Sequence, residues 1–382
     1  MALVLNEDQL LLKDSAQSFC QQLAPVSVLR RLRDSNDETG FDQAIWTQMV
    51  DLGWAGMAIP EAYGGYGFGY GGLGVVLEET GRTLVSSPLI STVLLAATAI
   101  NELGSEQQKQ ELLPKIVAGE LLVALALDEN SSHAPSRIHT SAERSGDGFI
   151  LNGAKTFVLD GHVAQKLIVV ARNSGEIDSK QGIGLFLVDA TLEGIAINRT
   201  HMVDSRNSAK IEFSQVEVGA DALLGEADGG FDGLDRVLDI ARIGLAAEML
   251  GSIQEVFERI LDFLKTREQF GILIGSFQGL QHRAATMYSE IELCKSVVRA
   301  ALAGLDDPAK SREDIAELAS IAKAKLSEVF FEVSNEGIQM HGGIGMTDEF
   351  DIGFFLKRAR VAQQFLGDAS FHRDRYASLN NF

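Results

Sequence analysis

The spacing of apolar residues divides the chain into three zones. In the first zone, up to about residue 120, apolar positions recur every three or four residues, as on one face of an amphipathic helix. The first of these runs, residues 10–19, follows Asn6, a residue type suited to capping the start of a helix. A glycine-rich loop after Pro60 lies between the further helices that the pattern predicts. Those helices are expected at residues 41–52, 72–83, 89–103 and 105–118.

The middle zone, from about residue 121 to residue 228, has a different texture. Short apolar runs alternate with Gly, Asn, Asp and Ser, and Asn152-Gly153 is a turn signal. Short runs with this spacing are typical of an antiparallel β-sandwich or barrel. The runs lie at residues 121–127, 149–151, 156–159, 166–171, 183–188 and 209–213.

The last zone predicts long helices. Helical periodicity covers residues 231–265, 278–305, 311–337 and 353–381. The order helix, sheet, helix predicts an α+β fold that ends in a four-helix bundle. The expected domains are an N-terminal helical domain at 1–120, a middle β domain at 121–230 and a C-terminal helical bundle at 231–382.

Composition excludes several classes of protein. The 382 residues carry a net charge of −20, whereas binding to nucleic acid or to an anionic membrane surface needs a basic face. Only two cysteines occur, Cys20 and Cys294, and their separation fits neither a disulfide framework nor a zinc site. The N-terminus lacks the pattern of a signal peptide, and no apolar stretch is long enough to span a membrane. We therefore expect a cytoplasmic protein.

Four short motifs occur in order along the chain, and together they resemble the acyl-CoA dehydrogenase family over essentially its whole length. The ending Phe365-Leu366-Gly367-Asp368-Ala369 is similar to that of the small subunit of bacterial pimeloyl-CoA-type dehydrogenases. The motifs are Pro60-Glu61-x-x-Gly64-Gly65, Leu224-Gly225-x-x-x-Gly229-Gly230-Phe231, Thr266-Arg267-x-Gln269-Phe270-Gly271 and Gln339-x-His341-Gly342-Gly343.

The resemblance implies a reaction and its partners. FAD would oxidise the Cα–Cβ bond of an acyl-CoA thioester, and an electron-transfer flavoprotein would take up the electrons. The chain would act in a homo- or hetero-oligomer, a dimer or tetramer.

Two of the motifs are candidate FAD contacts. An arginine near a helix end can hold a pyrophosphate, and a glycine-rich turn can present N–H groups to an anion. On spacing alone, Arg267 could equally be a surface arginine beside a core phenylalanine. The Gly342-Gly343 turn could equally be a simple helix C-cap. The resemblance implies FAD binding across a subunit interface by Arg267, Phe270, Gln278, Gln339, Gly342 and Gly343.

The half-site for the chain's own flavin departs from the family pattern. Where the family has a Thr-Glu-Pro run, residues 127–129 read Leu-Asp-Glu, and the following Gly-Ser-Asp becomes Ser132-His133-Ala134. The Trp-x-Thr strand behind the flavin becomes Phe157-Val158-Leu159. Leucine donates no side-chain hydrogen bond, so we expect this half-site to be degraded.

The catalytic base is also missing from its usual places. The reaction needs a carboxylate within hydrogen-bond reach of the α-proton and donors to the thioester carbonyl. The two positions where the family carries its glutamate hold Leu366 and Ala241. Asp368 is the nearest carboxylate and the candidate catalytic base, although an acidic residue at a helix start is more often a cap. Asp239 and Arg242 are candidate contacts to the pantetheine arm of the substrate.

Two function classes therefore remain open. One is a flavin-dependent dehydrogenase, and the other is a non-catalytic subunit that completes the FAD site of a catalytic partner. The seven histidines show no metal-ligand spacing, so no metal is assigned. The identity of the acyl chain is not readable from the sequence.

Overall fold

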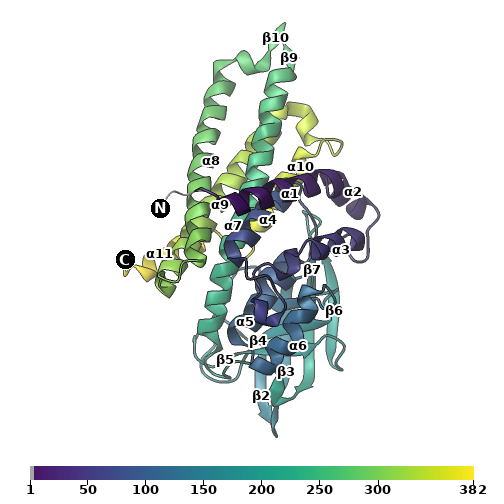
Figure 1. Ribbon diagram of the computed structural model, residues 1–382, viewed down its shortest axis with the longest axis vertical. Coiled ribbons are helices and arrows are strands. Elements are labelled where there is room, and N and C mark those ends of the chain that lie inside the picture. Colours follow the sequence, from purple (N-terminus) through teal and green to yellow (C-terminus); the bar gives the residue numbers. More distant parts are fainter. Residues whose placement is uncertain (1–3) are drawn as a thin grey trace. The chain divides into compact units, whose positions relative to one another are not determined.

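The computed structural model describes residues 4–382 and confirms the α+β class, with an N-terminal helical part, a middle sheet and a C-terminal helical part (Figure 1). Contacts between residues group the chain into two compact units. The helical unit comprises the segment up to residue 31, residues 70–85 and residues 242–382. The sheet unit comprises residues 32–69 and 86–241. The expected domain boundaries near residues 120 and 230 stay a prediction.

The N-terminal helices follow the predicted pattern with two differences. Asn6 caps the first helix together with Gln9, each side chain bonding to the other's backbone N–H. The segment Val26–Asp34 forms a helix that apolar spacing did not reveal, because it is rich in charged residues. Residues Leu89–Ala97 form a π-helical stretch. The α-helices are α1 (Glu7–Leu23), α2 (Val26–Asp34), α3 (Gln43–Asp51), α4 (Gly69–Arg82), α5 (Thr98–Leu103) and α6 (Glu106–Val117).

The sheet unit contains one mixed, mostly antiparallel sheet. Its order is β6-β7-β3-β2-β4-β5-β8, and β1 pairs in parallel with β4. Two predicted runs, 149–151 and 156–159, belong to the single strand β3, whose pairing with β7 shifts register twice. The strands are β1 (Val123–Ala126), β2 (Ser141–Ser145), β3 (Gly148–Leu159), β4 (Lys166–Arg172), β5 (Ile183–Asp189), β6 (Ile195–His201), β7 (Asn207–Val218) and β8 (Leu223–Leu224).

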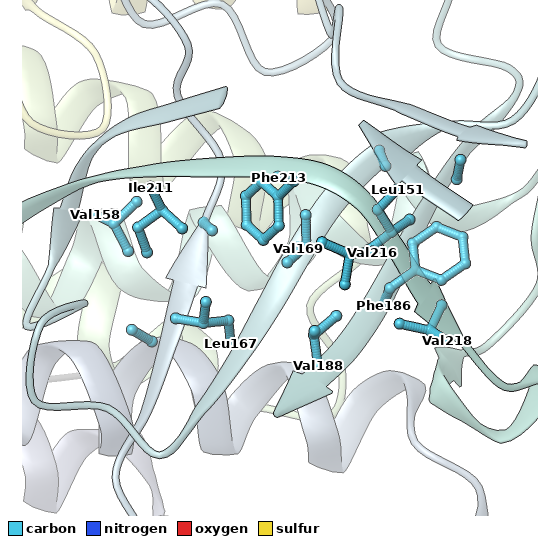
Figure 2. Packing of buried hydrophobic residues seen from close by; sticks show 14 of the residues in the cluster. Leu151, Val158, Leu167, Val169, Phe186, Val188, Ile211, Phe213, Val216 and Val218 are labelled. Carbon is cyan, nitrogen blue, oxygen red and sulfur yellow. The ribbon is translucent and has the colours of Figure 1, made fainter. Parts of the chain in front are cut away.

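One face of this sheet forms a dry core. Aliphatic side chains from β3, β4, β5 and β7 interdigitate around Phe186 and Phe213 (Figure 2). The rings of Phe149 and Phe186 meet edge to face, with centroids 5.0 Å apart. This core fixes the strands whose ends carry residues 127–133 and 157–160, the segments that depart from the family pattern.

The C-terminal helices form the bundle of the helical unit. α9 (Arg312–His341) packs against α8 (Gln278–Leu305), α10 (Ile352–Gln364) and α11 (Ala369–Leu379). α7 (Gly230–Thr266) is joined to α8 by a small hairpin of β9 (Glu268–Gln269) and β10 (Ile272–Leu273) (Figure 1). The prediction of a single helix at 353–381 is wrong, because a turn at residues 365–368 separates α10 from α11. No helix of residues 4–382 is long and apolar enough to cross a membrane.

Candidate functional site

The first candidate FAD contact projects from the end of α7. The N–H of Arg267 donates to the carbonyl of Phe263 at 2.9 Å, and its own carbonyl accepts from the N–H of Ile274 at 2.9 Å. These bonds anchor the β9–β10 hairpin. At its tip Phe270 adopts a left-handed conformation (φ 56°), and 92% of its surface is exposed. Ile272 and Leu273 of the same hairpin are also exposed, and a group of exposed apolar side chains marks an interaction surface.

The second candidate contact is the turn after α9. Gly342 has φ 61° and ψ −139°, a combination that is essentially restricted to glycine. A Cβ atom built on Gly342 or Gly343 would meet nothing within 4 Å, so the turn lies beside open space. The N–H of Gly342 itself donates to the Gln339 carbonyl. Gln339, on the last turn of α9, and Gln278, at the start of α8, are exposed as well.

His341 joins these two segments. Its buried ring lies 4.4 Å from the ring of Phe263 on α7 and 4.8 Å from the ring of Phe350. Its Nδ1–H donates to the carbonyl of Gly337 at 2.7 Å, and burial lowers the pKa of the imidazole. The neutral ring therefore packs the glycine turn against the helix end that leads to Arg267.

These residues fit part of a dinucleotide site. A guanidinium and the N–H groups of a glycine turn suit phosphate, and an exposed ring suits stacking on a base or ribose. The arrangement is one-sided, since Phe270 meets the edge of the Phe277 ring yet keeps 92% of its surface exposed. It fits FAD as a half-site that another chain would complete.

In the sheet unit, the loop after β1 is occupied by a buried ion pair. The Lys155 ammonium donates to a Glu129 carboxylate oxygen at 2.8 Å and to the Leu127 carbonyl at 3.0 Å. Glu129 also accepts from the hydroxyl and N–H of Thr140 and from the N–H of His139. Its side chain is 7% exposed, and that of Lys155 is fully buried.

The charges of this pair respond differently to burial. For Glu129, burial opposes ionisation, but the charge of Lys155 and the hydrogen bonds outweigh it and lower the pKa of the carboxyl. For Lys155, burial dominates and lowers the pKa of the ammonium, although Glu129 partly offsets that effect. Sequence reasoning noted the loss of a hydroxyl at Leu127 and missed this pair, because its partners are 26 residues apart.

A second pair lies beside the first. The Nδ1 of His133 is 3.0 Å from a carboxylate oxygen of Asp128, and the Asp128 carbonyl accepts from the N–H of Thr156 on β3. On the same strand, Phe157 has φ 53° and is 41% exposed, whereas Leu159 is buried. Left-handed conformations at non-glycine residues often accompany functional sites.

The turn that carries the missing base is in the helical unit. Leu366 is buried with φ 61°, and its carbonyl accepts from Nε of Arg242 at 3.3 Å. Asp368 caps α11, accepting from the N–H of Phe371 at 2.8 Å. The structure thus brings Arg242 to the turn of Leu366 and Asp368. Asp239, also buried, belongs to the sheet unit.

The sheet unit also contains a cavity of about 250 Å³ between the α2–α3 loop and the β6–β7 turn. Three arginines line it, but Arg199 donates to the carbonyls of Asp37 and Glu38, and Arg33 pairs with Asp34. We read these contacts as ties between the two loops and assign no ligand. The lining residues are Leu32, Arg33, Asn36, Gly40, Arg199, Thr200, His201, Met202, Val203, Ser205 and Arg206.

Comparison with known proteins gives a consistent result. Models of the N-terminal, middle and C-terminal domains of acyl-CoA dehydrogenase match residues 6–120, 125–216 and 228–378. Mitochondrial isovaleryl-CoA dehydrogenase of Pongo abelii is 31% identical over 379 residues, which cover 97% of this chain and 88% of that protein. The CarC subunit of the caffeyl-CoA reductase–Etf complex of Acetobacterium woodii is 27% identical, with 93% of each chain covered. The structure of butyryl-CoA dehydrogenase from Megasphaera elsdenii superposes with a TM-score of 0.89 at 26% identity, covering 100% of both chains.

Proposed function

Since three matching domain models span nearly its whole length, the chain belongs to the acyl-CoA dehydrogenase family, and we propose that it serves the FAD-dependent α,β-dehydrogenation of an acyl-CoA thioester. The observation that carries this proposal is the outward half-site of Arg267, Phe270 and the Gly342-Gly343 turn, joined through His341. When bound, FAD supplies the acceptor for the β-hydride.

The residues of this chain would divide the remaining work. Arg267 and the glycine turn would hold the FAD phosphates, while Gln278 and Gln339 would donate to the sugar or ring. The backbone N–H of Leu366 would meet the thioester carbonyl and stabilise the charge that develops there. Arg242 and Asp239 would support the pantetheine arm from α7.

Removal of the α-proton is the task for which residues 4–382 offer no well-placed group. Leu366 and Ala241 are buried apolar residues at the two usual positions of the base. Asp368 is the nearest carboxylate, but it faces the first turn of α11, where it caps the helix. We therefore assign proton removal to a partner chain and keep Asp368 as the candidate to be tested.

The second candidate function, a non-catalytic subunit, is favoured by the sheet unit. The Lys155 ammonium spends its N–H donors on the Glu129 carboxylate and the Leu127 carbonyl, so this loop offers a flavin few free donors. A chain of this kind would lend a half-site to a catalytic partner and bind no flavin by itself.

The electron acceptor follows from the relatives. The CarC relative belongs to a complex with an Etf component, and we propose an electron-transfer flavoprotein as the acceptor here. We place the protein in the cytoplasm, where two buried thiols stay reduced. Burial raises the pKa of Cys20 and of Cys294 to about 12, so neither is a ready nucleophile.

The test is flavin content, with and without a partner. The chain is purified alone and after co-expression with a paralogous dehydrogenase chain, and visible absorbance is recorded. We expect a colourless chain alone and a yellow complex that is reduced by acyl-CoA. A complex that never binds flavin refutes both candidate functions, and a yellow chain that turns over alone refutes the need for a partner.

Arg267→Ala tests the half-site itself. A charge-assisted hydrogen bond contributes about 1.5–3 kcal/mol to binding. We therefore expect the variant complex to bind FAD at least tenfold more weakly, as measured by FAD retained after dialysis. Arg373→Ala is the matched control, because Arg373 is an exposed arginine of the same unit that pairs with Glu328. Equal FAD retention by the two variants would remove Arg267 from the site.

A further inference from the structure

The turn between α10 and α11 is held in an unfavourable backbone conformation. Leu366 has φ 61° and Gly367 has φ 99°. A left-handed leucine is energetically unfavourable and persists only where its surroundings impose it. Because Leu366 is 2% exposed, those surroundings are protein side chains rather than water.

A buried lysine provides the main constraint. The ammonium of Lys323 on α9 donates to the Gly367 carbonyl at 2.7 Å, to the Gln363 carbonyl at 3.2 Å and to the Ser327 hydroxyl at 3.1 Å. Three donors thus meet three acceptors, which exhausts the hydrogen-bonding capacity of the ammonium. Lys323 has no exposed surface.

Two further side chains hold the preceding carbonyl. The Leu366 carbonyl accepts from Nε of Arg242 at 3.3 Å and from Nε2–H of His372 at 3.0 Å. The backbone is therefore held on both sides of the Leu366 N–H, by α9 through the Gln363 and Gly367 carbonyls and by α7 and α11 through the Leu366 carbonyl.

The charge on Lys323 is finely balanced. Burial and, to a lesser extent, the positive charge of Arg242 on α7 lower the pKa of its ammonium, the Asp368 carboxylate at the start of α11 partly offsets them, and the resulting pKa is about 7. From α11 comes the imidazole of His372, and from α10 the neutral carbonyl of Gln363. A protonated amine donates stronger hydrogen bonds than a neutral one, so the grip on the turn weakens as the pH rises.

We propose that Lys323 is a positioning residue that clamps the Leu366–Gly367 turn and so orients the Leu366 N–H toward the acyl thioester. This role rests on the proposed function, since it assumes that the thioester carbonyl meets that N–H. Lys323 itself touches no substrate atom. It acts through the Gly367 and Gln363 carbonyls. Because the charged ammonium holds these carbonyls more tightly, flavin reduction by acyl-CoA should be faster below about pH 7 than above it.

The first experiment needs neither a variant nor a substrate. Hydrogen–deuterium exchange is measured on peptides covering residues 363–372 of the wild-type chain from pH 6 to pH 9 and corrected for intrinsic exchange rates. We expect protection to fall as the pH passes 7, while peptides from β7 in the core of the sheet unit stay unchanged. Equal protection of the turn across this range would overturn the clamp.

The second experiment links the clamp to the reaction. Flavin reduction by acyl-CoA in the full complex is compared for wild type, Lys323→Met and the control Lys325→Met, a half-buried lysine on the same helix that pairs with Glu290. We expect Lys323→Met to be about tenfold slower at pH 6, with the difference from wild type shrinking toward pH 9, and Lys323→Arg to restore the rate. The control variant should keep the wild-type pH profile.

The outcomes separate the two levels of the argument. One outcome is that protection of the turn changes with pH while the rate difference between wild type and Lys323→Met does not. Lys323 would then stabilise the turn without positioning the Leu366 N–H for the reaction, and the positioning role would be overturned. A complex that reduces no flavin at any pH refutes the proposed function, whatever the exchange experiment gives. If Lys323→Met does not fold, the wild-type exchange profile and the Lys323→Arg kinetics still decide the proposal.

Discussion

At the residue scale, the loop after β1 shows how a replaced residue is compensated. Leu127 stands where the family resemblance places a hydroxyl, and leucine offers no side-chain donor. What the sequence could not reveal is that Lys155 reaches the carbonyl of that residue and Glu129 together. The pairing depends on the register between β3 and the segment after β1, which follows from tertiary packing rather than from local spacing.

Lys155→Met tests this pair. The change leaves Glu129 charged in a nearly buried position, and breaking a buried ion pair from one side costs about 3–5 kcal/mol. Urea denaturation should show a loss of that size, and Glu129→Gln/Lys155→Met should recover part of it. A double variant no more stable than Lys155→Met would contradict a coupled pair.

The pH dependence of the pair has a definite sign. Because the folded pKa of Glu129 is lowered, its contribution to stability is present above the unfolded pKa, near 4.5, and is lost as the pH falls through the lower folded value. Glu129→Gln should therefore flatten the acid limb of the stability profile in denaturation series between about pH 5 and pH 3. An unchanged acid limb would show that other carboxyls dominate it.

Asp368 separates capping from catalysis. Asparagine caps helices as well as aspartate does, whereas alanine costs about 1 kcal/mol. We expect Asp368→Asn to keep stability and to slow flavin reduction in the full complex only slightly, because loss of the carboxylate lowers the pKa of Lys323. Asp368→Ala should lose stability as well. A large drop in rate for Asp368→Asn with FAD still bound would instead establish Asp368 as the base.

At the element scale, the sequence predicted most helices and the β texture of the middle zone, because apolar periodicity reports which face of an element is buried. It missed α2, a short helix with three arginines among its nine residues. It missed β6, whose residues are mostly half-buried or exposed, so no apolar run marks them. It also extended the last helix through residues 365–368, since the left-handed Leu366 is imposed by tertiary contacts that local sequence does not encode.

The turn after α9 offers a comparison between two neighbouring glycines. Gly342 needs its left-handed conformation, so Gly342→Ala should destabilise the fold by roughly 1–3 kcal/mol. Gly343 is under no such constraint, and an added Cβ meets no atom of the chain. Gly343→Ala should leave the melting temperature unchanged and weaken FAD retention in the complex. Unaltered retention would place the dinucleotide elsewhere.

At the scale of the whole molecule, the chain combines an open half-site in one unit with a self-satisfied loop in the other. Such a chain would contribute its half-site to the FAD of a partner and bind no FAD of its own. A complex with an intact paralogue should therefore contain one FAD for each pair of chains. Flavin released by denaturation, counted against both chains by quantitative mass spectrometry, checks this ratio. Two flavins per pair would show that the loop around Glu129 still accepts a cofactor.

The burial of Lys155 and Lys323 also sets their chemical reactivity. Acylating reagents attack neutral, accessible amines, and a pKa of about 7 leaves most Lys323 side chains neutral at pH 8. The amine is thus primed for attack and protected only by its lack of exposed surface. Surface lysines should be modified first and Lys323 only when the bundle opens. The rate at which Lys323 is labelled therefore reports the rate of local unfolding beside the turn.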